Sequence, residues 1–189
     1  MSLMIQNNVL EERLILVDEH DNNVGVGTKL QVHRQGALHR AFSVFIFDSQ
    51  GRLMLQQRAS GKYHSGGLWT NSCCGHPRPG ESNHAASTRR LFEEMGFTCE
   101  LNEVDQILYR VDVSNGLVEN EYNHTFIGSF DQMPNLNPEE AEGWKWMRVA
   151  DVFTAIKQNP AHFTAWFKVI LAHFGDETIQ QWADRYRSA

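Results

Sequence analysis

The stretch that most constrains this chain runs from Cys74 to Phe97 and reads C-G-H-P-R-P-G-E-S-N-H-A-A-S-T-R-R-L-F-E-E-M-G-F. Its second half predicts a helix, because Ser82 is a suitable N-cap and Gly96 is a suitable left-handed C-cap. Four side chains between the caps recur at helical spacing: Ala85, Thr88, Phe92 and Met95. Two ion pairs four residues apart are expected in the last turns: Arg89–Glu93 and Arg90–Glu94. By itself, such a charged end is typical of a solvated helix face.

Read from Gly75, the same stretch has the form G-x5-E-x7-R-R-L-x-E-E-x-G-F. It resembles the Nudix box, G-x5-E-x7-R-E-U-x-E-E-x-G-U with U an apolar residue, at every fixed position except one. Arg90 stands where that box has its first helix glutamate. The resemblance implies a Nudix fold, which is a mixed β-sheet sandwiched between α-helices, in the α/β (α+β) class.

The arginine at position 90 bears on the chemistry. In the hydrolases of the family, the box glutamates together hold a divalent metal on a diphosphate and help to activate water. Arg90 removes one metal ligand and supplies a planar fork of donors suited to phosphate oxygens. We therefore expect this chain to bind a diphosphate but to hydrolyse it slowly.

Composition sets limits on the class of protein. The 189 residues fit one domain, 1–189, with residues 1–13 as an N-terminal extension in which 1–3 can be a cloning remnant. The net charge of -6 argues against a nucleic-acid partner, and no apolar run reaches membrane length. Cys73, Cys74 and Cys99 form no CxxC pair. This favours a reducing compartment, so a cytoplasmic location is expected.

Strands and helices are mixed along the chain. Strands are expected at residues 14–17, 24–28, 42–47, 53–57, 107–113, 118–130 and 144–147. After the box helix, further helices are expected at residues 151–158, 163–174 and 177–187. Residues 30–40 have no clean period. On the long strand at 118–130, alternate side chains share a face, so Glu119, Glu121, Asn123 and Thr125 should point the same way.

A wider resemblance links several short motifs. They are T-N-S-C-C-G-H-P at residues 70–77, V-E-N-E at 118–121, the box with Arg90, and His33 and His39, which precede a hairpin. The strands expected at 42–47 and 53–57 form this hairpin around the turn Asp48–Gly51. Together these motifs resemble type 1 isopentenyl-diphosphate isomerases over roughly residues 14–170. Without that resemblance, each histidine would be an ordinary polar residue, and the acidic pair an exposed strand face.

The resemblance implies two metal sites. One divalent ion would be held by His33, His39, His76, Glu119 and Glu121. Nitrogen and oxygen donors suit Mn²⁺ or Mg²⁺, with Zn²⁺ competing on affinity. Glu119 and Glu121 are two apart on a strand, about 7 Å between Cα atoms, which lets them share an ion. A second ion, Mg²⁺, would join Glu94 to the substrate's diphosphate. No flavin is expected.

The same resemblance implies the substrate contacts and the acid–base groups. Four bases would surround the diphosphate: Lys29, Arg58, Lys62 and Arg90. Cys74 and Glu121 would lie on opposite faces of the allylic carbons, with Tyr109 assisting Glu121. Trp166 would place its ring over the cationic centre. Cys73 is expected to be a small buried apolar residue.

The function expected from this resemblance is the reversible isomerisation of isopentenyl diphosphate to dimethylallyl diphosphate in isoprenoid biosynthesis. Two alternatives stay open, a Nudix hydrolase of another diphosphate compound and a metal-containing binding module without turnover. The expected partner is a small prenyl diphosphate, with no nucleic acid and no membrane. Monomer and homodimer are both compatible with the sequence.

Overall fold

The structure is a computed structural model that describes residues 12–188. Most of the expected N-terminal extension therefore lies outside the described residues, and Arg13 belongs to the first strand. The helices are α2 (Lys29–Gln35), α3 (Asn83–Met95), α4 (Val149–Gln158) and α5 (Ala165–Asp184), with short 3-10 turns η1 (Ser114–Gly116) and η2 (Pro160–His162). None of the helices in this part of the chain has the length and apolar character needed to cross a bilayer.

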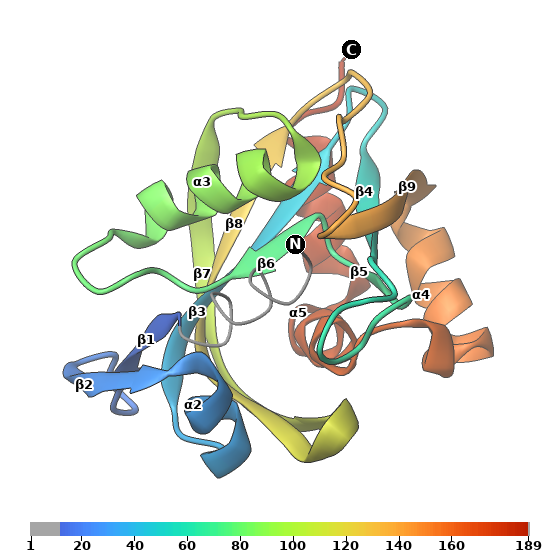
Figure 1. Ribbon diagram of the computed structural model, residues 1–189. Helices are drawn as coiled ribbons and strands as arrows, with labels where there is room; N and C mark the ends of the chain where they lie inside the picture. Colours follow the sequence, from blue (N-terminus) through green and yellow to red (C-terminus); the bar gives the residue numbers. More distant parts are fainter. Residues whose placement is uncertain (1–11, 189) are drawn as a thin grey trace.

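Within residues 12–188, a single mixed sheet of nine strands forms the centre of the fold. Its strands are β1 (Arg13–Val17), β2 (Asn23–Thr28), β3 (His39–Phe47), β4 (Arg52–Arg58), β5 (Trp69–Thr70), β6 (Cys73–Gly75), β7 (Leu101–Val113), β8 (Leu117–Ser129) and β9 (Ala141–Arg148). β3 pairs in parallel with β8 and antiparallel with β6, while β7 and β8 form a long hairpin. The expected mixed sheet between helices is confirmed (Figure 1).

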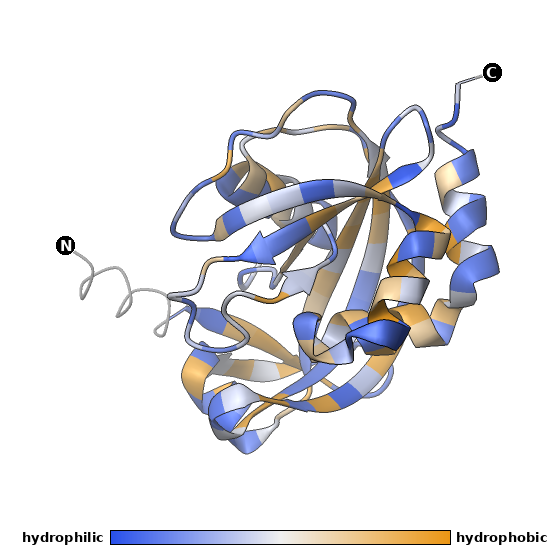
Figure 2. Cartoon of the chain, turned by 90° about the vertical axis from the view of Figure 1, so that its right-hand side faces the viewer, coloured by the Kyte–Doolittle hydropathy of each residue, from blue (hydrophilic) through white to orange (hydrophobic). Residues whose placement is uncertain are grey.

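β3 is buried on both faces because helices cover the sheet on both sides. Phe42, Val44 and Ile46 pack into a cluster with residues of α3. Phe45 and Phe47 point the other way, into a cluster with residues of α4 and α5. This explains the continuous apolar run in the sequence, since both sets of alternate side chains leave water. Figure 2 shows hydrophobic residues along the central strands and on the neighbouring helices.

The caps of α3 are as the sequence predicts. Ser82 accepts a hydrogen bond from the backbone N–H of Ala85, and Gly96 adopts the left-handed conformation at φ 74°. The apolar spacing, however, indicated the wrong face, because Phe92 is 60% exposed. The buried side chains of the helix are Ala86, Ser87, Leu91, Glu94 and Met95. Glu94 lies on the buried side because that face lines a polar pocket as well as the core.

Four local features differ from the sequence prediction. α2 occupies the stretch without a clean period; it buries only Val32 and His33, too few to produce one. β6 was not expected as a strand, since its three residues are too short for a pattern. β7 begins at Leu101, ahead of the predicted start at 107, through polar residues that include a β-bulge. The two expected C-terminal helices run together as α5, with a break at Gly175.

Candidate active site

A pocket opens where β6, β8, α2 and α3 meet the loop after β4. Almost all residues predicted for the site line it: Lys29, Arg58, Lys62, Cys74, His76, Arg90, Glu94, Tyr109, Glu119, Glu121 and Trp166. The exceptions are His33 and His39, which are fully buried behind the pocket wall. The fold therefore gathers side chains that are up to 137 positions apart in the sequence (Lys29 to Trp166).

The predicted histidines and carboxylates form one cluster. Ligand atoms of His33, His39, His76 and Glu119 all lie within 4.8 Å of one another. Glu121 joins them, with its Oε1 atom 3.4 Å from Nε2 of His76 and 3.9 Å from Nε2 of His39. The side chains arrive from α2, β3, the segment after β6, and β8. Glu119 and Glu121 share one face of β8, as the alternation predicts.

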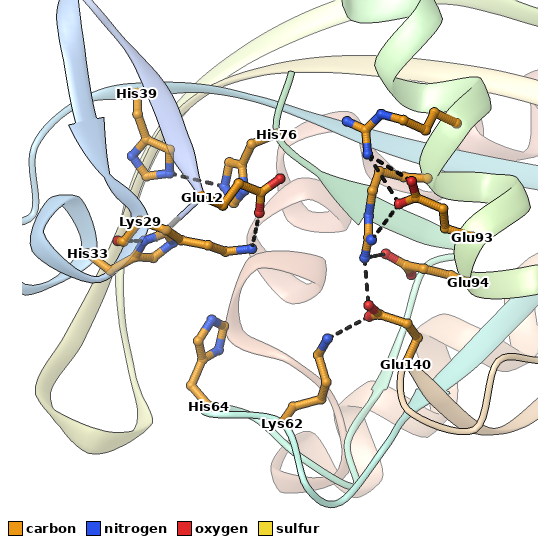
Figure 3. A network of polar contacts seen from close by, with 12 residues as sticks. Glu12, Lys29, His33, His39, Lys62, His64, His76, Glu93, Glu94 and Glu140 are labelled. Carbon is orange, nitrogen blue, oxygen red and sulfur yellow. Dashed lines mark hydrogen bonds and ion pairs between the residues drawn. The ribbon is translucent and has the colours of Figure 1, made fainter. Parts of the chain in front are cut away.

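Backbone carbonyls fix how two of the imidazoles face. Nδ1 of His33 lies 2.7 Å from the carbonyl of Lys29, and Nδ1 of His39 lies 2.9 Å from the carbonyl of Ala37. A carbonyl only accepts, so in each neutral ring the proton sits on Nδ1. The unprotonated Nε2 atoms are left to face the cluster, which is the arrangement of metal-binding histidines. Nε2 of His39 lies 3.2 Å from Nε2 of His76 (Figure 3).

Orphaned polar atoms in the cluster test whether a cation fits. Nε2 of His33 and Oε2 of Glu119 are buried, lie 3.1 Å apart, and have no partner in hydrogen-bond geometry. Leaving such atoms unpaired in the interior is costly. A cation placed between them would accept the lone pair of His33 Nε2 and neutralise the charge on Glu119 Oε2. Nitrogen and oxygen donors of this kind suit a divalent metal. The residues present therefore fit a divalent ion.

The pKa values describe a cluster poised to bind a cation. Burial, followed by the neighbouring His76, lowers the pKa of His39 to about 4. Burial, followed by Lys29, lowers the pKa of His76 to about 3. Burial alone would raise the pKa of Glu119, but contacts with two imidazoles hold it well below its usual range. Burial would also lower the pKa of His33, but its contact with Glu119 raises it. His39 and His76 are therefore neutral beside an ionised Glu119, which are the forms that ligate metals, and a metal bound at Nε2 of His33 would displace any proton on that atom.

Glu121 divides its two oxygens between the cluster and the pocket. Oε1 faces the imidazoles, whereas Oε2 accepts hydrogen bonds from the Tyr109 hydroxyl at 2.5 Å and from Asn123 Nδ2 at 2.9 Å. Tyr109 is its cross-strand partner in the β7–β8 hairpin. Burial, and next the charge of Glu119, raise the pKa of Glu121 to about 7. Glu121 can therefore hold or release a proton near neutral pH.

Cys74 lies on β6 with its sulfur on the pocket side. Its Sγ–H donates to Oδ1 of Asn71 at 3.1 Å, and Ser43 Oγ lies 3.8 Å away. Asn71 Nδ2 donates to two backbone carbonyls, those of Val44 and Cys73, so its oxygen is left to face the thiol. Burial, and next the Glu121 carboxylate, raise the pKa of Cys74 to about 12. Cys74 is thus a neutral thiol in this state.

Cys73 points to the other side of the sheet. It is fully buried in the cluster that contains Phe42 and Leu91. Neighbouring residues of a strand face opposite ways, so only one of the two adjacent thiols can reach the pocket. The prediction that Cys73 is a small apolar core residue is confirmed.

Three of the four predicted bases, all but Arg58, line the pocket already paired with carboxylates (Figure 3). Lys29 contacts Glu12 at 3.1 Å, and Lys62 contacts Glu140 at 2.5 Å. Arg90 contacts three carboxylates: those of Glu93, Glu94 and Glu140. These pairs keep the bases in place within one region, where an incoming anion could exchange with the carboxylates.

Arg58 and Trp166 form the opposite wall. The Arg58 guanidinium carbon lies 5.1 Å from the Trp166 ring centroid, within cation–π range. Trp166 is nearly fully buried near the start of α5, yet it lines the pocket. Glu94 faces the same space, and its Oε2 accepts a hydrogen bond from Gln56 at 2.8 Å.

Four residues that line the pocket escaped the sequence analysis, as did one that contacts the Cys74 thiol from behind. The four are Glu12, Tyr63, His64 and Glu140, and the fifth is Asn71. Asn71 lies inside the quoted motif T-N-S-C-C-G-H-P, so its neighbourhood was a usable signal. Glu12 and Glu140 have no signal of their own, because an isolated glutamate in a polar stretch is usually solvated.

Comparisons with known proteins agree with this geometry. The NUDIX domain family matches residues 37–167. A Serratia proteamaculans protein named isopentenyl-diphosphate Delta-isomerase is 53% identical over 174 residues, covering 92% of this chain and 97% of that protein. A Burkholderia multivorans protein of the same name is 48% identical over 176 residues, covering 93% of this chain and all of that protein.

Solved structures agree on the fold. A Deinococcus radiodurans protein, DR0079, superposes with a TM-score of 0.72 at 20% identity, covering 87% of this chain and 100% of that one. At this identity the likeness concerns the fold alone. With the domain match and the close sequence relatives, the chain belongs to the isopentenyl-diphosphate Delta-isomerase family of NUDIX domain proteins.

Proposed function

We propose that this protein interconverts isopentenyl diphosphate and dimethylallyl diphosphate, with Cys74 and Glu121 as its two proton carriers. Relatives about 50% identical over most of the chain carry the name of this isomerase. The observation that carries the proposal for the residues is that a thiol and a carboxylate of unusually high pKa line one buried pocket.

The reaction needs two acid–base groups. Moving the double bond requires adding a proton at the terminal carbon and removing another two carbons away, with a tertiary carbocation between the steps. From isopentenyl to dimethylallyl diphosphate, Glu121 with Tyr109 donates and Cys74 accepts; in reverse they exchange roles. The hydrogen bond from the Tyr109 hydroxyl to Glu121 supports a phenol that relays or stabilises the donated proton.

The protonation states bear on direction. A Cys74 pKa of about 12 makes the neutral thiol the resting form, ready to donate, whereas Glu121 near pH 7 is available in both forms. The resting state therefore suits protonation of dimethylallyl diphosphate, and the forward direction requires Cys74 to lose its proton first. The bases and any cation in the pocket favour the thiolate by their positive charge.

The remaining residues bind and shield. Lys29, Arg58, Lys62 and Arg90 would hold the diphosphate, and the Trp166 ring would face the cationic intermediate. Two divalent ions would supply positive charge that lowers the pKa of nearby acids. One, Mn²⁺ or Mg²⁺, would be held by the cluster of His33, His39, His76, Glu119 and Glu121, and the other, Mg²⁺, by Glu94. A cytoplasmic location, absence of a nucleic-acid or membrane partner, and the oligomeric state remain predictions from sequence.

Proton exchange tests the proposal directly. When dimethylallyl diphosphate is incubated with the protein and Mn²⁺ in heavy water, deuterium should enter the prenyl chain of the substrate. Isopentenyl diphosphate should also form. Cys74→Ala should lower isomerisation by about 10²–10⁴-fold, the range for the loss of one acid–base group. Glu121→Gln should also fail. Cys73→Ala is the matched control and should retain activity.

Three outcomes would contradict the proposal. Substantial turnover by Cys74→Ala would remove this thiol from the chemistry. Phosphate release without deuterium exchange would identify a hydrolase, and binding without either reaction would identify a non-catalytic module.

A further inference from the structure

We propose that His64 is a positioning residue that orients the Glu119 carboxylate toward the imidazole cluster and supports the Trp166 ring. The part that concerns substrate rests on the proposed isomerase function, whereas the part that concerns metal affinity does not. Neither the box nor the other quoted motifs include His64, which lies in the loop between β4 and β5.

His64 contacts the carboxylate oxygen of Glu119 that does not face His33. Its Nε2 lies 3.3 Å from Oε1 of Glu119, whereas Nε2 of His33 lies 3.1 Å from Oε2. The carboxylate is therefore held between two imidazoles, one on each oxygen. His64 is only 4% exposed although it lines the pocket, so its ring is held by protein contacts. In Figure 3 it lies beside the imidazole cluster, on the side of Lys62.

One of the two neutral tautomers of His64 suits this task. Its Nδ1 lies 3.2 Å from the Ser65 hydroxyl, which can donate to it. With Nδ1 as acceptor, the neutral ring carries its proton on Nε2, toward Glu119. A carboxylate that ligates a metal is usually fixed by such an outer partner, and loss of the partner typically weakens metal binding.

The loop itself is attached to the hairpin that carries Glu119. The backbone N–H of Ser65 donates to Ser114 Oγ at 3.0 Å, and Asn115 Nδ2 donates to the carbonyl of Tyr63 at 2.7 Å. Both partners belong to η1, the turn that joins β7 to β8. His64 and Glu119 are therefore held together by backbone contacts on either side of His64, which is what precise orientation requires.

The other side of the His64 ring contacts the wall formed by Arg58 and Trp166. Its centroid lies 5.6 Å from the Trp166 ring at an interplanar angle of 87°, an edge-to-face contact. The carbonyl of His64 also accepts from Arg58 Nη2 at 3.2 Å, and Arg58 in turn covers Trp166. One side chain thus connects the metal-ligand carboxylate to the aromatic wall of the pocket.

Two substitutions separate the two roles. His64→Gln can keep an N–H near Glu119 but loses the aromatic ring, whereas His64→Phe keeps the ring and loses the donor. Mn²⁺ affinity, measured by calorimetry on the metal-free protein without substrate, should fall by about 10–100-fold in His64→Phe and stay within about 3-fold in His64→Gln. In the isomerase assay at saturating Mn²⁺, His64→Gln should raise KM or lower kcat, because the ring that supports Trp166 is gone. His64→Phe keeps an aromatic ring there and should retain most of the wild-type activity.

His20 provides the matched control, because its side chain is 75% exposed. His20→Phe and His20→Gln should leave Mn²⁺ affinity and kinetics unchanged, and circular dichroism should confirm that all variants are folded. Equal Mn²⁺ affinity in wild type and His64→Phe would overturn the proposal. Equal loss in His64→Gln and His64→Phe would also overturn it, since it would make His64 a direct ligand. The calorimetry stands even if no isomerase activity is found.

Discussion

For single residues, the charged neighbours in the pocket shift the pKa and fix the position of a charged side chain. Glu140 illustrates this, because it lies between Lys62 at 2.5 Å and Arg90 at 3.1 Å. Burial would raise its pKa, but Arg90 and Lys62 together lower it to about 2. A glutamate that no motif indicates thereby fixes two bases that come from a loop and from α3.

Glu140 should make stability depend on pH. Its pKa is lowered on folding, so its contribution is complete above the usual value of 4.5 and is lost as pH falls toward about 2. Glu140→Gln should destabilise the fold by about 1.5–3 kcal/mol at pH 7, the range for hydrogen bonds with charged groups. Urea unfolding at pH 7, 5, 4 and 3 should show the difference from wild type shrinking below pH 4.5.

The exposed neighbour Glu139 provides the control for this measurement. Glu139→Gln should match wild type at every pH. A difference for Glu140→Gln that stays constant from pH 7 to pH 3 would show that its ionisation is not what stabilises the fold.

At the scale of elements, the end of α3 decides where Arg90 and Glu94 lie. Gly96 ends the helix at φ 74°, and its N–H donates to the carbonyl of Phe92. A Cβ atom at this position would lie 2.2 Å from the backbone oxygen of Asn135, so the segment after β8 would have to move. The sequence indicates the cap but not this close approach.

Gly96→Ala should therefore lower the free energy of unfolding by more than the cost of a left-handed alanine alone. The strain of the left-handed conformation costs about 1–2 kcal/mol for an alanine. Gly80→Ala is the matched control, because Gly80 has φ 83° and nothing within 4 Å of the added Cβ. Thermal unfolding should show a larger decrease in Tm for Gly96→Ala than for Gly80→Ala. Equal decreases would mean that the contact with Asn135 contributes nothing.

At the scale of the whole molecule, the imidazole and carboxylate cluster connects elements that are distant in sequence. α2, β3 and β8 each contribute side chains, and the segment after β6 contributes His76. The unfolded chain cannot present this set, so a divalent ion should bind the folded state preferentially. Binding then adds to the free energy of unfolding in proportion to the logarithm of the metal concentration.

Metal should therefore raise thermal stability. At a free Mn²⁺ concentration about 100 times the Kd, the gain should be about 2.7 kcal/mol, and a chelator should remove it. Glu119→Gln should lose most of this metal-dependent shift, whereas Glu139→Gln should retain it. Scanning calorimetry with and without Mn²⁺ measures both. An unchanged Tm in wild type at saturating Mn²⁺ would contradict a metal site in this cluster.

Features whose signal is local can be predicted from the amino-acid sequence. The caps of α3, the hairpin around Asp48–Gly51 and the shared face of Glu119 and Glu121 follow from residue types at short spacings. Motif resemblance supplied the family and named residues that the fold gathers around one pocket. These could be predicted because turns, caps and alternation depend on neighbours in the chain.

The remaining features depend on how distant parts of the chain pack together. The pairing of β6 with β3 turns Cys74 toward the pocket and Cys73 into the core. The contact of a loop with the β7–β8 turn brings His64 to Glu119, and the pocket brings Glu140 between two bases. Neither of these two contacts could be predicted from sequence, because the partners lie about 50 or more positions apart in the chain. The charges that folding brings beside Glu140, those of Arg90 and Lys62, set its pKa.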